Sequence, residues 1–167
     1  MQDGTLRDAA LALGGLAAGV ALAPESARAA PKNVPPYWAS IAGPSALMRT
    51  GPGTNFPATW RYVRSGMPLR VVQIHKDWRR VRDPQGADGW MRSTLLSARR
   101  TAMVQGDTRP LYAAPGGGGA VVAQVEAGVV GSLARCADGW CRFQTQGRSG
   151  YIEARWLWGV DPDESLD

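Results

Sequence analysis

The sequence predicts an all-β protein built from two similar small barrels, each with about five short strands. Three observations lead to this fold class: the chain repeats itself, each copy alternates apolar and polar residues as strands do, and no helical period runs through either copy. An open sheet of this size would leave its edges exposed and would bury too little apolar surface. We therefore expect each copy to close into a barrel.

The two copies span residues 43–100 and 101–159. The first opens with "GPSALMRTGPGTNFPATWRYV" and the second with "GDTRPLYAAPGGGGAVVAQVE". The matched positions are Gly51-Pro52-Gly53 with Ala114-Pro115-Gly116, Val63 and Gly66 with Val125 and Gly128, Trp78 with Trp140, Val81 with Phe143, Gly86 with Gly147, Gly89-Trp90 with Gly150-Tyr151, and Leu95-Leu96 with Trp156-Leu157. The offset between matches changes only from 63 to 61 residues, so the order of turns and strands is preserved.

Within the first copy, alternation predicts strands over residues 69–75 and 78–83, joined by a turn at Lys76-Asp77, and a further short strand over 89–92. The second copy gives strands over 129–136, 140–145 and 150–153. Aromatic residues recur where these strands begin: Trp78, Trp90, Trp140 and Tyr151. We expect them to pack in the core and at the barrel rims rather than to hold a cofactor.

The first 29 residues predict a signal peptide. Ala9 to Ala23 is an uncharged run of 15 residues, which suits the apolar part of a signal peptide and is short for a membrane span. Ala27-Arg28-Ala29 fits the cleavage pattern, with the cut between Ala29 and Ala30. Because Arg7 is flanked by Asp3 and Asp8, an uncleaved anchor and a cytoplasmic amphipathic helix stay open as alternatives. Cleavage would place the protein in the periplasm or outside the cell, with a Pro-rich lead over residues 30–42.

Each copy resembles a bacterial SH3 (SH3b) module. The stretch "LMRTGPGTNFP", residues 47–57, is similar to the family's opening strand and turn. The likeness continues through Gly66-Met67, Trp78 with Val81, Gly89-Trp90 and the closing Leu95-Leu96. The second copy departs from the pattern, because Tyr112 stands at the place of Arg49 and four glycines, 116–119, stand at the place of "GTNF". The resemblance implies a non-catalytic, exported module that binds wall components or proteins.

Cys136 and Cys141 flank a four-residue turn between two predicted strands. Opposed residues in a hairpin bring their Cα atoms to about 4.5–5.5 Å, which is within disulfide reach, so we favour a disulfide. Zinc would need two further ligands in a chain with a single histidine, and a redox pair usually has two intervening residues instead of four. The first copy has Ile74 and Arg79 at the same places, so the bridge would hold only the second copy.

The sequence gives no support for an enzyme, a cofactor or a metal site. The only histidine, His75, lies on a predicted strand beside a turn, where a surface or packing role is expected. Neither the serine-hydrolase elbow nor the zinc-peptidase helix motif occurs in the chain.

Charge divides unevenly between the copies. Residues 43–100 carry 11 basic and 3 acidic side chains, a net charge of +8, whereas residues 101–159 carry 5 and 4, a net charge of +1. Residues 160–167 hold four acids and no base, and we expect a frayed, solvated end there. The basic residues of the first copy either form a solvated surface that keeps the protein soluble or line a groove for anionic partners.

We expect the partner to be peptidoglycan or an envelope protein. A regulatory partner of a wall hydrolase and a basic protein that binds nucleic acid or other anions are the alternatives, although cleavage of the leader would keep the protein away from nucleic acid. A membrane would be a partner only if the leader stays uncleaved.

For the binding residues, we expect the first copy to contribute Arg49, Asn55, Phe56, Trp60, Trp78 and Arg80. Aromatic rings beside arginines suit an extended peptide that bears carboxylates, because a guanidinium pairs with a carboxylate through two parallel hydrogen bonds. The second copy offers fewer charges, so the first copy is predicted to carry most of the affinity.

Overall fold

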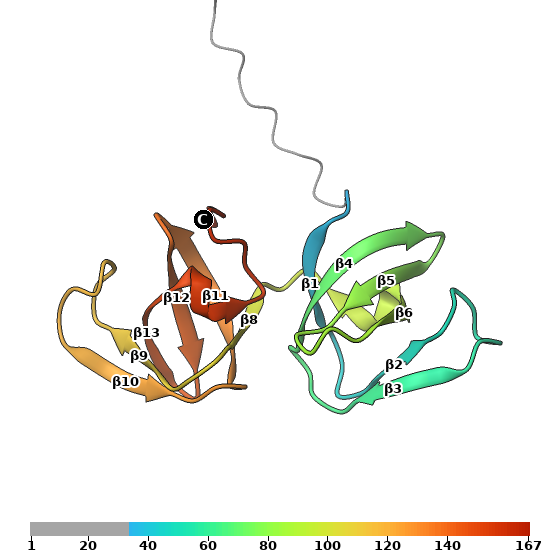
Figure 1. Cartoon of the computed structure of the whole chain (residues 1–167), viewed down its shortest axis with the longest axis horizontal. Helices are drawn as coiled ribbons and strands as arrows, with labels where there is room; N and C mark the ends of the chain where they lie inside the picture. Colours follow the sequence, from blue (N-terminus) through green and yellow to red (C-terminus); the bar gives the residue numbers. More distant parts are fainter. Residues whose placement is uncertain (1–33) are drawn as a thin grey trace, which may run out of the picture. The chain divides into compact units, whose positions relative to one another are not determined.

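The computed structural model describes residues 34–167, and every strand in this range belongs to one of two β-sheets (Figure 1). These residues lie within one compact unit. The predicted signal peptide and its cleavage site fall outside the described range. Over residues 34–167 there is no helix of the length and apolar character that a membrane span requires.

The first sheet, which we call domain 1, is coloured from blue to green in Figure 1. Its strands are β1 (Tyr37–Ile41), β2 (Ala46–Arg49), β3 (Ala58–Tyr62), β4 (Pro68–His75), β5 (Trp78–Arg82), β6 (Asp88–Arg92) and β7 (Leu96–Ser97), with a single 3₁₀ turn, η1 (Ser93–Leu95), before the last. Their order in the sheet is β3-β2-β6-β5-β4-β1-β7, and all neighbours run antiparallel.

The second sheet, domain 2, repeats this plan element by element. Its strands are β8 (Thr101–Val104), β9 (Arg109–Tyr112), β10 (Val121–Val125), β11 (Val130–Ala137), β12 (Trp140–Thr145), β13 (Arg148–Glu153) and β14 (Leu157–Trp158), with η2 (Ala154–Trp156) before the last. The order β10-β9-β13-β12-β11-β8-β14 is the order of domain 1 with each strand replaced by its counterpart.

The predicted fold class, all-β with two tandem SH3-like domains, is confirmed. Each sheet has seven strands instead of about five, because the first and the last strand of each domain along the chain gave no clear alternation in the sequence. One of these, β1, lies inside the predicted Pro-rich lead and pairs with β4 from Tyr37 opposite Val71 to Ser40 opposite Pro68. Because β3 and β7 stand at the two ends of the strand order, each barrel is partly open.

Each domain has its own core. The core of domain 1 contains Ala39, Ile41, Ala46, Met48, Leu69, Val71, Val81 and Met91. The core of domain 2 contains Ala102, Val104, Leu111, Val125, Leu133, Cys136, Cys141, Phe143, Ile152, Ala154, Leu157 and Val160. Buried positions alternate with more exposed ones along β6, β12 and β13, as expected for a sheet with one buried face.

Close packing explains why both copies have a glycine before the aromatic residue, in Gly89-Trp90 and Gly150-Tyr151. A Cβ atom on Gly89 would lie 2.6 Å from Met48 Cγ and 2.8 Å from the Arg49 carbonyl oxygen. The counterpart, Gly150, would meet Leu111 Cβ at 2.8 Å. Only glycine therefore lets β6 approach β2, and β13 approach β9, this closely.

One of the matches made from the sequence is wrong by a residue. Val125 was paired with Val63, but Val125 stands opposite Arg109 at the end of its strand, as Tyr62 stands opposite Ala46. Val125 is 5% exposed and Val63 is 76% exposed. Domain 1 has one more residue before the following glycine turn, and this extra residue shifts the alignment.

The predicted disulfide between Cys136 and Cys141 is confirmed. The two residues stand opposite each other across the β11–β12 hairpin, with their Cα atoms 4.1 Å apart. In domain 1 the equivalent opposed pair is Ile74 and Arg79, as the sequence predicted.

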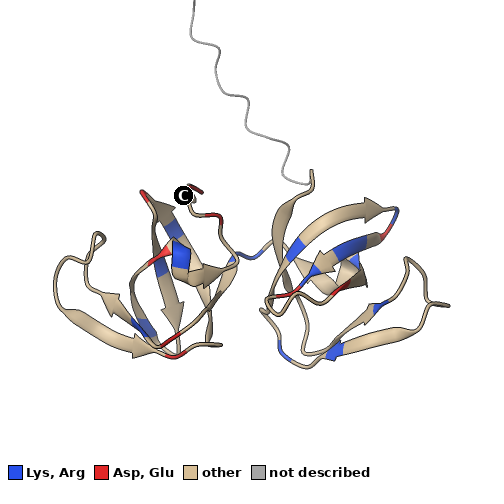
Figure 2. Cartoon of the chain, viewed as in Figure 1, with Lys and Arg blue, Asp and Glu red and all other residues tan. Residues whose placement is uncertain are grey.

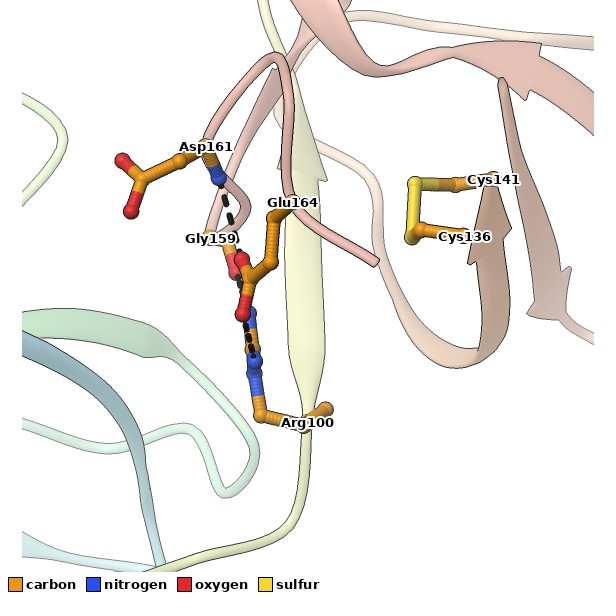
Figure 3. The surroundings of a disulfide bond; sticks show 6 residues. All are labelled: Arg100, Cys136, Cys141, Gly159, Asp161 and Glu164. Carbon is orange, nitrogen blue, oxygen red and sulfur yellow. Dashed lines mark hydrogen bonds and ion pairs between the residues drawn. A yellow bond between two sulfur atoms is a disulfide. The ribbon is translucent and has the colours of Figure 1, made fainter. Parts of the chain in front are cut away.

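The prediction of a frayed C-terminal end is wrong. The Leu166 amide donates to the Cys136 carbonyl, the Cys136 amide donates to the Leu166 carbonyl, each at 3.0 Å, and Leu166 packs on the core of domain 2. Glu164 accepts hydrogen bonds from Arg100, and Figure 3 draws this pair together with the neighbouring disulfide. Glu164 looked solvated in the sequence because its partner, Arg100, lies 64 positions earlier, and Asp161 likewise pairs with the distant Arg70.

Candidate binding groove in domain 1

A cavity of about 280 Å³ opens on domain 1. It is lined by Ser45, Ala46, Leu47, Arg49, Thr54, Trp78, Arg92 and Leu95. These residues come from β2 with the residue before it, the loop between β2 and β3, the start of β5, the end of β6 and η1. The set contains two arginines and no acid, so the cavity, which we call the groove, favours an anionic ligand.

Arg49 is the last residue of β2 and stands opposite Trp90 of β6. Its Nη1 donates a hydrogen bond to the Phe56 carbonyl oxygen at 2.7 Å, across the loop that follows the strand. This loop is closed by a bond from the Thr50 amide to the Pro57 carbonyl. The guanidinium is thus held over the loop, while its remaining N–H groups can donate elsewhere.

Trp78 and Arg92 form the other side of the groove. They are opposed residues of β5 and β6, and opposed residues of an antiparallel pair project to the same face. The guanidinium carbon of Arg92 lies 5.7 Å from the centre of the Trp78 ring, within the range of a cation–π contact. The ring therefore forms a flat wall that keeps Arg92 near the groove.

The arginines of the groove differ from their neighbours in charge pairing. Arg80 and Arg82 both pair with Asp88, at 2.5 and 3.3 Å. Within residues 34–167, neither Arg49 nor Arg92 has an ion-pair partner. Both arginines of the groove are therefore available to an anionic ligand, whereas the basic residues that Figure 2 marks along β5 include two that Asp88 pairs.

Of the six residues expected to bind, the structure places Arg49 and Trp78 in the groove. Arg80 is turned to Asp88, Trp60 is 58% exposed on edge strand β3, and the Phe56 ring packs on Gly51, where an added Cβ would lie 2.4 Å from Phe56 Cδ1. Asn55 is exposed in the loop between β2 and β3.

Six lining residues were not foreseen: the polar or charged Ser45, Thr54 and Arg92, and the apolar Ala46, Leu47 and Leu95. Arg92 could have been found from the strand register. The turns predicted on either side of the Trp78 strand place the end of the next strand, "GWMR", opposite this tryptophan.

The corresponding place in domain 2 has different chemistry. Tyr112 replaces Arg49, and its ring lies 5.9 Å from that of Trp140, while Glu153 stands opposite Trp140 where Arg92 stands opposite Trp78. Trp156 replaces Leu95 and is stacked by Arg109, whose guanidinium carbon lies 3.6 Å from the ring centre. Arg155 pairs with Glu153 at 2.7 Å. In domain 2 the arginines at this place, Arg109 and Arg155, thus already contact Trp156 or Glu153, and the carboxylate of Glu153 takes the position that the unpaired Arg92 has in domain 1.

The remaining candidates for chemistry are isolated. His75 is exposed and contacts the Trp90 ring edge to face, with the ring centres 6.3 Å apart, so it serves as a packing residue. Over the described part of the chain, no three His, Cys, Asp or Glu side chains cluster as metal ligands would.

The comparison with known families identifies both domains. The family model for the bacterial SH3 domain matches residues 42–98 and again residues 105–159. The chain belongs to the bacterial SH3 domain family. Bacterial SH3 domains are binding modules rather than catalytic units. No curated protein matches the chain.

Among solved structures, the chain is similar to NlpC1 and NlpC2 from Trichomonas vaginalis and to an NlpC/P60 family protein from Bacillus cereus, in each case with 15% sequence identity. The TM-scores are 0.33, 0.34 and 0.33. The matches cover 73%, 74% and 72% of this chain and 45%, 48% and 55% of those chains. The bacterial SH3 chain thus spans about half the length of these structures.

Proposed function

We propose that this bacterial SH3 protein is exported and binds a carboxylate-bearing peptide of the cell wall, or an acidic segment of an envelope protein, in the groove of domain 1. The observation that carries the proposal is the pair of arginines, Arg49 and Arg92, on either side of Trp78 in a cavity without an acid. A guanidinium is always charged and pairs with a carboxylate through two parallel hydrogen bonds.

The geometry supports a small, extended ligand. The groove is about 280 Å³, near the lower end of the range of about 300–1,000 Å³ for small-molecule sites. Leu47, Leu95 and the Trp78 ring supply apolar walls, and the arginines supply the polar contacts. This division, with mostly apolar walls and few polar groups, is typical of ligand sites.

Domain 2 supports the proposal by contrast. Its equivalent position carries Glu153, which would repel a carboxylate, and its arginines stack on Trp156. We therefore assign the binding of the anionic group to domain 1. The higher net positive charge of the first copy, +8 against +1 for the second, favours the same assignment.

Export is part of the proposal and rests on the leader pattern and on the disulfide, because disulfides persist in oxidising compartments. Intact mass of the protein from envelope fractions should begin at or near Ala30. A cytosolic protein that still carries Met1 would contradict export.

The binding test compares charge-matched variants. Purified wall sacculi and a short acidic stem peptide are offered to the wild type, to Arg49→Gln/Arg92→Gln, and to the control Arg82→Gln/Arg148→Gln, which loses the same two charges outside the groove. The groove variant should bind at least about tenfold more weakly, since a hydrogen bond to a charged group is worth about 1.5–3 kcal/mol. If both double variants bind equally, the groove is not the site.

A further inference from the structure

The β4–β5 hairpin of domain 1 and the β11–β12 hairpin of domain 2 occupy the same place in the two sheets, but only the second is covered. Cys136 of β11 forms a bridge with Leu166 of the C-terminal segment and is 2% exposed. Ile74 of β4 has the position of Cys136, since it stands opposite Arg79 as Cys136 stands opposite Cys141. Ile74 is nevertheless 38% exposed, because nothing covers it as Leu166 covers Cys136.

The edge of β4 over residues 72–75, which we call the open edge, has no strand partner within residues 34–167. The pairing of β1 with β4 stops at Tyr37 opposite Val71. Because the two hairpins share one register, the backbone amide and carbonyl of Ile74 point away from the hairpin, as those of Cys136 do when they bond to the C-terminal segment. Unpaired backbone groups beside an exposed aliphatic side chain form a template for a further strand.

Arg79 takes the place that the disulfide has in domain 2. Its Nε donates to the Tyr37 hydroxyl at 3.2 Å, and its Nη1 donates to the carbonyl oxygens of Lys76 and Trp78 at 2.9 and 3.1 Å. These bonds hold the guanidinium at the end of the hairpin and leave its Nη2 able to donate to another group. Because Arg79 and Ile74 are opposed on antiparallel strands, their side chains project to the same face.

The end of this hairpin is more basic than its counterpart. Residues 73–79 carry two bases and one acid, Asp77, whereas residues 135–141 carry one base and one acid. In the described part of the chain, neither Lys76 nor Arg79 has an ion-pair partner. The charge beside the open edge therefore favours an acidic partner.

We infer that the open edge binds an extended, acidic segment of a partner protein, which adds a strand to β4. Antiparallel pairing would put an aliphatic side chain of the partner beside Ile74 and the residue two positions earlier at the Lys76 turn. An acid at that earlier position would meet a cation. The expected partner sequence is thus an acid, any residue and a large aliphatic residue.

The C-terminal segment of this chain has such a sequence in "ESL", residues 164–166. In domain 2 the place of Lys76 is taken by Asp138, whose charge disfavours an acid beside it. Glu164 is paired with Arg100 instead. The same sequence offered to domain 1 would find Lys76 at this place.

The open edge is separate from the groove. Trp78 lines the groove, and Arg79 follows it on β5, so the two side chains project to opposite faces. Neither Arg79 nor any residue of the open edge lines the groove. Failure of one site therefore leaves the other untouched.

The test is an NMR titration of the purified chain with a synthetic, N-terminally acetylated peptide of residues 160–167, "VDPDESLD". Saturable shifts are expected for the amides of residues 72–76, with slower hydrogen exchange at the Ile74 amide because it gains an acceptor. A peptide with Leu166→Ala should bind about tenfold more weakly, since it buries less apolar surface. A peptide with Glu164→Gln should bind about two- to fivefold more weakly.

Variants of the protein test the same contacts from the other side. Ile74→Thr keeps a β-branched residue on the strand and should weaken binding about fivefold through lost apolar contact. Lys76→Gln, at an exposed turn, should weaken it about two- to fivefold. Arg148→Gln, which removes an exposed charge in domain 2, is the matched control. This control and the groove variant Arg49→Gln/Arg92→Gln should bind the peptide as the wild type does.

The inference fails if no shift saturates, or if Ile74→Thr and Lys76→Gln both bind as the wild type does. Shifts at Cys136 would mean that the peptide displaces the C-terminal segment of domain 2, and shifts at Trp78 and Arg92 would place it in the groove; either result overturns the inference. A dimer of the wild type that Ile74→Thr abolishes would assign the open edge to a second copy of this chain and would overturn it as well.

Discussion

Arg100 holds the carboxylate of Glu164 with both ends of its guanidinium, through Nη1 to Oε1 at 2.5 Å and Nη2 to Oε2 at 2.9 Å (Figure 3). Nη2 also donates to the Gly159 carbonyl at 2.8 Å. Both side chains are only about one-fifth exposed, at 21% and 23%. The pair fastens the C-terminal segment to the residue that precedes β8.

Glu164→Ala should therefore destabilise domain 2 even though the residue lies only three positions before the last residue, Asp167. The change removes two charge-assisted hydrogen bonds and leaves Arg100 partly buried without its partner, so the free energy of unfolding should fall by about 1–3 kcal/mol. Urea denaturation measures the change. Asp163→Ala is the control, because Asp163 is exposed and should leave stability unchanged. Equal stability of both variants would mean that the segment is not fastened in solution.

Reduction of the Cys136–Cys141 disulfide should lower the melting temperature of domain 2 and leave domain 1 unaffected. A ring of six residues stabilises a fold by about 2 kcal/mol in the chain-entropy model. Cys136 also pairs with Leu166 through its backbone, so reduction should raise amide exchange at Leu166. Thiol labelling checks the oxidised state, and calorimetry with and without reductant checks the stability. A single unchanged transition in reductant would contradict this account.

The sequence predicted the elements whose signals are local. Glycine turns and the alternating strands around Trp78 and Trp140 can be recognised in short stretches of sequence. Because the chain repeats, each of these elements is also predicted a second time, in the other copy. The disulfide was predictable for the same reason, since a hairpin turn sets the opposition of its two cysteines.

What the sequence could not give depends on distant partners. Arg80 was chosen for the site because it is near Trp78 in the chain, but Asp88 neutralises it, and Arg92 takes the free position next to the ring. In the same way Glu164 looked solvated until Arg100, 64 residues away, was placed beside it. Strand pairing, rather than residue type, decides which charge is available.

Gly89→Ala and Gly150→Ala should each destabilise their own domain. The added Cβ on Gly89 would overlap Met48 and the Arg49 carbonyl, and the one on Gly150 would overlap Leu111 and the Val122 side chain. Overpacking of a dense core costs about 1–3 kcal/mol. Gly43→Ala is the matched control, since no atom lies within 4 Å of its added Cβ. Because Arg49 is part of the contact, Gly89→Ala should also weaken binding in the groove, whereas Gly150→Ala should not.

The last prediction concerns Tyr62 and Asp83. The Tyr62 hydroxyl donates to Asp83 Oδ2 at 2.9 Å and ties the end of β3 to the turn before β6. Asp83 is 5% exposed, and its Oδ1 accepts from the Gln85 and Ala87 amides at 3.0 and 2.8 Å. Burial, followed by the hydrogen bond to Asp83 and the charge of that carboxylate, raises the pKa of Tyr62 well above its usual value.

The sign of the pH effect follows from this shift. An unfolded tyrosine ionises near pH 10, whereas the folded Tyr62 keeps its proton to a higher pH. The stabilisation is therefore fully present below about pH 10 and is lost as the pH rises from there toward the folded pKa.

Tyr62→Phe should lower the stability of domain 1 by about 1–2 kcal/mol at neutral pH, because a buried carboxylate loses a donor. The gap between wild type and variant should narrow in alkali. Urea denaturation at about pH 8 and about pH 11 measures both gaps. Tyr151→Phe is the control, since the Tyr151 hydroxyl makes no hydrogen bond within residues 34–167. If the difference in stability between wild type and Tyr62→Phe stays constant with pH, the hydrogen bond from the Tyr62 hydroxyl to Asp83 does not contribute to stability as expected.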